Sequence, residues 1–273
     1  MSVLVVLLAG LVVASGLTSA TASPQLPKAK VTKVLAFGPP PSAIPNLEAV
    51  YVPIKPCRAA DTRLSSAGIL RHGSTRPFYV RGSAGFAGQG GTSSGCGIPA
   101  AATGVTVNAT VTGESASGYM TNYPTGMTVP LSNFVSYHKS DTITANPTFT
   151  LATGGVEPSV QIRTSTAANA HLIIDVTGYY MPQIQALVNP TGSIYAGSPR
   201  VLSVAKVATG YFQVAIDTNV NYCTPMVHPY YANEYATATT VSGTSVYVHV
   251  WYLDPSSHAE TPVDDYFYLS VSC

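Results

Sequence analysis

The sequence predicts an all-β protein made of two antiparallel β-sandwich domains of the jelly-roll or immunoglobulin-like type. In residues 105–112, apolar side chains alternate with threonine and asparagine, which is the period of a half-buried strand. The 21 prolines and 23 glycines disfavour long helices and favour many turns. Only 9% of the residues are charged, so threonine, serine, asparagine and tyrosine must supply the solvated surface.

The N-terminus has the features of a signal peptide, residues 1–22. An apolar stretch at residues 3–14 precedes small residues at Ala20 and Ala22, and we expect cleavage after Ala22. No lysine or arginine precedes the apolar stretch, so a retained membrane anchor is the alternative, although the stretch is short for a span of about 20 residues. We therefore expect a secreted or cell-surface protein whose mature chain has no transmembrane span.

Residues 23–49 are rich in proline and predict a linker or extended arm. Within them, residues 30–37 could form a strand. Such a strand could lie at a sheet edge, or it could be donated to a neighbouring subunit.

The four cysteines predict two disulfides in an exported protein. Three pairings are open, and we favour Cys57 with Cys96 and Cys223 with Cys273, because each bond then stays within one proposed domain. A zinc site is the alternative, but no CxxC or paired Cys/His spacing supports it.

The first domain is expected to span residues 50–182. Alternation and β-branched content place its strands at residues 78–80, 105–111, 119–123, 133–137, 148–151, 160–163 and 172–180. In the last of these strands, His171, Ile173, Asp175, Thr177 and Tyr179 are predicted to share one face, with Tyr180 on the other.

Asp175 lies among apolar residues, and a buried, unpaired charge costs several kcal/mol. We therefore expect a structural ion pair between Asp175 and Arg63 or Arg58, with Asp61 holding the guanidinium from the other side. The alternative is that Asp175 faces water on an edge strand.

The second domain is expected to span residues 183–273, with alternating strands at residues 201–207, 211–217, 246–250 and 267–273. The alternation in the last strand places Cys273 on the inward face. Residues Tyr247, His249 and Trp251 would face outward, as would Tyr266 and Tyr268. If the two strands are neighbours in one sheet, these aromatic side chains form a contact surface, unless the first domain or residues 230–240 cover it.

Three segments together resemble a largely uncharacterised family of exported bacterial β-proteins. They are PCRAADTR at residues 56–63, CGIPAAATGVTVNATVTG at residues 96–113 and AHLIIDVTGYY at residues 170–180. The final FYLSVSC also resembles the C-terminal β-modules of bacterial surface and fibre-like proteins that end in F-x-L-x-V-x-C. These resemblances imply a fold and a compartment, and they carry over no catalytic residue.

No enzyme motif is found. The six histidines are scattered, and no HExxH, GxSxG or P-loop occurs. No glycosidase pair can be recognised among Glu114, Glu157, Glu234 and Glu260, which lie far apart. Asp264 and Asp265 are interpreted as a solvated turn rather than a calcium loop. The net charge of +1 and the lack of a basic block exclude a phosphate-binding surface for nucleic acid. We expect no cofactor and no metal.

The sequence thus favours a structural or adhesive protein that acts through contacts, such as self-association or binding to a cell-surface polymer. One alternative is a carbohydrate-binding module that uses exposed aromatic side chains. A second is a filament subunit with an N-terminal donor strand.

Overall fold

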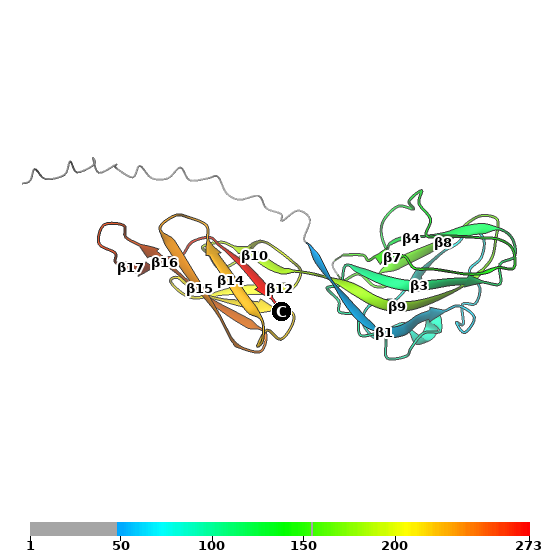
Figure 1. The fold of residues 1–273 in the computed structure, drawn as a ribbon, viewed down its shortest axis with the longest axis horizontal. Coiled ribbons are helices and arrows are strands. Elements are labelled where there is room, and N and C mark those ends of the chain that lie inside the picture. The colour runs from blue at the N-terminus through cyan, green and yellow to red at the C-terminus, as the bar shows by residue number, and fades with distance from the viewer. Residues whose placement is uncertain (1–47, 154) are drawn as a thin grey trace, which may run out of the picture. The chain divides into compact units, whose positions relative to one another are not determined.

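The computed structural model describes residues 48–153 and 155–273, so the predicted signal peptide and nearly all of the predicted arm lie outside the described residues. The described chain is all-β, with eighteen strands and one short 3-10 helix, η1 (Ala87–Gln89) (Figure 1). Every strand pair is antiparallel. No helix among the described residues is long and apolar enough to cross a membrane.

Two sheets enclose the first apolar core. One has the order β1-β9-β3-β6, with β7 also paired to β3, and the other has the order β2-β8-β4-β5. The strands are β1 (Ala49–Asp61), β2 (Thr75–Phe78), β3 (Gly104–Thr112), β4 (Gly118–Pro124), β5 (Val135–Tyr137), β6 (Thr142–Ala145), β7 (Thr148–Thr150), β8 (Val160–Thr164) and β9 (His171–Pro182).

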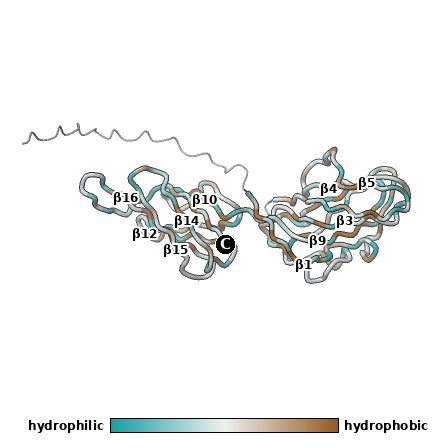
Figure 2. Tube along the Cα trace, viewed as in Figure 1, coloured by the Kyte–Doolittle hydropathy of each residue, from teal (hydrophilic) through white to brown (hydrophobic). Residues whose placement is uncertain are grey.

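Strand β3 lies in the middle of its sheet, and its alternation determines which side faces the core. Val105, Val107, Ala109 and Val111 are at most 1% exposed, whereas the polar residues between them lie at the outer face. Burying a valine contributes about 1.5–3 kcal/mol. Figure 2 shows such apolar residues distributed along the strands of both parts of the chain.

A bulge in β9 reverses its alternation near the end. Thr106 of β3 is opposite Gly178, whereas the next residue, Val107, is opposite Val176, so Thr177 is an extra residue. Tyr179 consequently packs against the core. The predicted grouping of Tyr179 with the outer residues was therefore wrong, because alternation within the sequence does not reveal a bulge.

Strand β1 was not predicted as a strand, because Pro53 and Pro56 interrupt it. Among the described strands it pairs only with β9, at the edge of its sheet. An edge strand tolerates prolines because one side of its backbone needs no partner in the sheet.

Two further sheets enclose the second apolar core, in the orders β11-β10-β18-β14 and β12-β13-β16-β15, with β17 also paired to β16. The strands are β10 (Ile184–Val188), β11 (Ile194–Gly197), β12 (Val201–Ala208), β13 (Tyr211–Ile216), β14 (Thr224–Pro229), β15 (Glu234–Ser242), β16 (Ser245–Leu253), β17 (Glu260–Pro262) and β18 (Phe267–Ser272).

The alternating residues of β13, β16 and β18 form this second core. Phe212, Val248 and Phe267 are each 0% exposed. Cys273 follows the end of β18 and is exposed, so the predicted inward position was wrong. The strand pairing ends at Ser272, and the disulfide to Cys223 rather than the strand alternation directs the Cys273 side chain.

Candidate contact surface

Both disulfides favoured by the sequence are present in the structure. Cys57 of β1 is bonded to Cys96, which follows η1, and Cys223 is bonded to Cys273. The bonded residues are 39 and 50 positions apart. In the chain-entropy model, closing loops of this length stabilises a fold by about 4 kcal/mol each.

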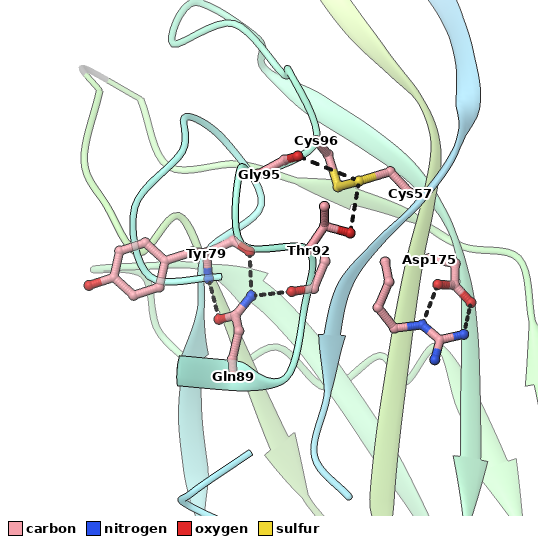
Figure 3. Close-up of a disulfide and its surroundings, with 9 residues drawn as sticks. Cys57, Tyr79, Gln89, Thr92, Gly95, Cys96 and Asp175 are labelled. Atoms are coloured by element: carbon pink, nitrogen blue, oxygen red, sulfur yellow. Dashed lines mark hydrogen bonds and ion pairs between the residues drawn. A yellow bond between two sulfur atoms is a disulfide. The ribbon is translucent and has the colours of Figure 1, made fainter. Parts of the chain in front are cut away.

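A buried glutamine strengthens the region of the first disulfide (Figure 3). The side-chain amide of Gln89 donates to the carbonyls of Ala59 and Tyr79, both at 2.7 Å, and its Oε1 accepts from the Tyr79 N–H at 2.9 Å. The amide thus ties β1 to the loop that carries Cys96. This contact could not be predicted, because a single glutamine in a Gly-rich loop has no distinctive spacing.

The segment Asp61-Thr62-Arg63 is structural. Asp61 is fully buried, and its carboxylate accepts from Arg63 at 2.9 and 2.7 Å and from Arg58 at 3.1 Å. The hydrogen bonds from Arg63 hold the pKa of Asp61 below its ordinary value. Asp175 is bound by Arg58 rather than Arg63, so the predicted network exists and Arg58 is its central residue.

A contact with Thr62 explains the structural role of His171. The Thr62 Oγ1 accepts a hydrogen bond from the Leu172 N–H at 2.9 Å and lies 3.1 Å from the Nδ1 of His171. The histidine thus helps to join the end of β1 to the start of β9.

Five aromatic rings form a continuous row, four of them stacked, on the outer face of the sheet β12-β13-β16-β15. We call this group the aromatic ladder. Its order is Tyr247, Tyr211, His249, Trp251 and Tyr235, from strands β16, β13, β16, β16 and β15. All five side chains are partly exposed. The sequence predicted the three members on β16, but Tyr211 and Tyr235 join only through the pairing of their strands with β16.

The rings of the ladder cover one another's faces. The centroids of Tyr211 and His249 are 4.1 Å apart with an interplanar angle of 17°, and those of His249 and Trp251 are 5.1 Å apart at 11°. Trp251 and Tyr235 are 5.1 Å apart at 13°. These are distances and angles of offset stacking. The stacked rings therefore contact their neighbours through their faces and present mainly their edges to solvent.

Tyr266 and Tyr268 do not belong to this surface. Strand β18 lies between β10 and β14 in the opposite sheet, so the predicted joint patch was wrong. Sequence alternation assigns a face to each strand but not a neighbour. Tyr266 and Tyr268 instead belong to a second aromatic group with Tyr195, Tyr230 and Tyr231.

A pair of carboxyl groups lies beside this second group. Burial, together with the charge of Asp265 and a hydrogen bond to it, raises the pKa of Glu234 to about 8. Asp264, the residue before Asp265, accepts hydrogen bonds from the Lys206 ammonium at 2.5 Å and from the Gly210 N–H at 2.9 Å. The interpretation of Asp264 and Asp265 as a plain solvated turn was therefore wrong, because both carboxylates have partners from distant parts of the sequence.

Besides Asp61, the first part of the chain contains another buried carboxyl group, that of Glu114. Glu114 is 3% exposed, and neither of its carboxylate oxygens has a partner on another described residue. Burial, with a smaller effect of Asp141, raises the pKa of Glu114. Glu157, by contrast, is paired at 2.7 Å with the buried Arg81.

Within residues 48–153 and 155–273, no group of three or more histidine, cysteine, aspartate and glutamate side chains is arranged to hold a metal ion. No protein-family model, no curated protein and no solved structure matches this chain.

Proposed function

We propose that this chain is an extracellular structural or adhesive protein that acts through contacts of its β-sheet surfaces. The observation that carries the proposal is the aromatic ladder. Five rings lie on the outer face of a sheet whose opposite face already supplies the apolar core. Clusters of partly exposed aromatic side chains commonly form interfaces, because each combines a large apolar area with a polar tip.

The rigidity of the surface supports the same conclusion. Each ring of the ladder is held by at least one neighbour, and the strands beneath are paired along their length. A preformed surface loses little side-chain entropy when it docks, so less of its contact energy is lost to ordering. The disulfides add stability in an oxidising environment.

Carbohydrate binding is the second candidate, and the ring orientation makes it weaker. Sugar rings stack on exposed aromatic faces, whereas His249 and Trp251 are each stacked on two neighbours in the ladder, and Tyr211 is stacked on His249. Tyr247 and Tyr235 lie at the two ends of the ladder, and each has one ring neighbour in it. The contact role uses edges and polar tips, which the ladder does present.

The test is the double variant Tyr247→Ser and Trp251→Ser in the full secreted chain. We expect both disulfides and the β-rich circular dichroism spectrum to be kept. The fraction of protein that sediments with the producing cells after washing should fall at least fivefold. A glycan array run with both proteins tests the carbohydrate alternative.

The matched control is Tyr195→Ser with Tyr268→Ser, which removes two rings from the opposite sheet. This control should retain cell association. If the ladder variant stays folded and remains cell-associated to the same degree as the control, the ladder is not the contact surface. If it unfolds, the rings are part of the core.

A further inference from the structure

The edges of the sheets differ in how they are protected against pairing with another chain. Prolines interrupt two of the four longest edge strands. They are Pro53 and Pro56 in β1, and Pro225 and Pro229 in β14. Proline lacks a backbone N–H and is a common guard of sheet edges. The other two long edge strands in the described part of the chain, β12 and β15, contain no proline.

Of these two, β15 lies against β14, whereas β12 is the more open. Leu202 is 61% exposed and Val207 is 52% exposed, so this edge presents apolar side chains to solvent. Lys206, the only charged residue of β12, is neutralised by Asp264 of the same chain.

The open part of this edge is residues 202–205. At Lys206 the turn between β10 and β11 covers the backbone, since a Cβ on Gly192 would lie 2.9 Å from the Lys206 nitrogen. The described structure shows no hydrogen bond from the backbone of Leu202, Ser203, Val204 or Ala205 outside the pairing with β13. These backbone groups are available to an added strand.

We propose that residues 30–37 of a second copy of this chain add as a strand to the open edge of β12. This inference rests on the proposed contact function and specifies how copies associate. The segment KVTKVLAF contains no proline, and its apolar side chains suit an added strand.

Charge and chain length favour this occupant. Residues 23–47 carry three lysines and no acidic residue, a formal charge of +3. Residues 183–273 carry two basic and six acidic residues, a formal charge of −4. Residues 38–48 include four prolines, and eleven extended residues at ~3.1 Å each reach about 34 Å. A strand donated within one chain would create no contact between molecules, whereas a strand donated to another copy would join two molecules.

The first variant protects the acceptor edge. Leu202→Lys with Ala205→Lys places charges on two exposed positions of β12, repelling the lysines of the donated segment. The control is Met127→Lys with Leu131→Lys, which adds the same charge at exposed positions of the first part of the chain. Sedimentation should show that the edge variant self-associates at least tenfold more weakly than the control.

The second variant replaces residues 30–37 by a Gly/Ser segment of equal length, which leaves every described residue unchanged. It should also be monomeric. Mixed with the edge variant it should form a 1:1 dimer, because one partner supplies a donor and the other an acceptor. Amide hydrogen exchange at residues 202–205 should slow on mixing.

Three outcomes would overturn the proposal. The unmodified protein could be monomeric with fast exchange at residues 202–205. It could be monomeric with slow exchange that depends on residues 30–37, which would mean that the arm pairs within its own chain. The two variants could also fail to form a dimer. The ladder variant keeps both the donor segment, residues 30–37, and the acceptor edge of β12. Its cell association therefore tests the proposed function independently of strand addition.

Discussion

Arg58 and Asp175 connect two neighbouring strands through a two-point ion pair. The Arg58 Nε lies 2.6 Å from Oδ1 of Asp175, and its Nη2 lies 3.0 Å from Oδ2. The third nitrogen of the guanidinium reaches Asp61 at 3.1 Å, so one arginine holds two carboxylates. The two carboxylates differ in burial, since the Asp61 side chain is 0% exposed and the Asp175 side chain is 26% exposed.

This difference in burial predicts that replacing aspartate by asparagine lowers the free energy of unfolding by different amounts at the two positions. Asp61→Asn should lower the free energy of unfolding by about 3 kcal/mol, because it breaks a buried pair. Asp175→Asn should lower it by about 1 kcal/mol, because solvent screens a partly exposed pair. Urea denaturation of both variants measures the costs, and equal values would contradict the assigned burial. Because the folded pKa of Asp61 is depressed, its contribution is present above an ordinary pKa near 3.8 and is lost as the pH falls through the folded pKa.

The raised pKa of Glu234 predicts a pH dependence of the free energy of unfolding that is opposite in sign to that of Asp61. Its folded pKa of about 8 exceeds the ordinary 4.5, so the folded state binds the proton more tightly than the unfolded state. The free energy of unfolding should therefore decrease as the pH rises from about 4.5 to about 8. Glu234→Gln should flatten that slope, whereas Glu48→Gln, at an exposed position, should not. Melting temperatures at five pH values measure the slope, and parallel curves for all three proteins would refute the prediction.

The two disulfides should be reduced in a fixed order. Cys273 is exposed, whereas both Cys57 and Cys96 are partly buried. A thiolate must reach the sulfur it attacks, so the Cys223–Cys273 bond should open first. Alkylation of free thiols during a dithiothreitol titration, followed by mass spectrometry, gives the order. Earlier labelling of Cys57 would show that local opening rather than exposure controls reduction.

Gly178 allows Tyr51 to cross the outer face of the sheet. A Cβ at Gly178 would overlap the Tyr51 ring, whose hydroxyl lies 3.3 Å from the Oγ1 of Thr106. Gly178→Ala should therefore cost about 1–3 kcal/mol through overpacking. The same change in a Tyr51→Ala background should cost at least ~1 kcal/mol less, since the clash is then absent. Additive costs in a double-mutant cycle would show that the two residues do not interact.

Local alternation predicted the all-β class and most of the inward residues. It works where one face of a regular strand is buried, as in β3 and β13, because the side-chain period is then set by the pleat. It missed β1, whose prolines resemble a loop signal, and it misassigned Tyr179, which follows a bulge.

Contacts between strands were less predictable than the strands. The separation of β16 from β18, and the meeting of Glu234 with Asp265, depend on sheet order, which no local pattern encodes. The ion pairs of Arg58 could be anticipated because an aspartate within an apolar strand requires a partner. The choice between Arg58 and Arg63 depended on register, which only the structure supplies.

The extra residue at Thr177 also fixes the lengthwise position of β9. Before it, even-numbered residues such as Ile174 and Val176 face the core, and after it the odd-numbered Tyr179 does. A slide of β9 by one position against β3 would misplace the residues on both sides of Thr177, and no alternative alignment restores both at once. Deleting Thr177 would give one uniform phase, but it would shift everything after it by about 3.4 Å relative to β1 and β3. A single inserted residue thus makes one alignment of the strand uniquely favourable.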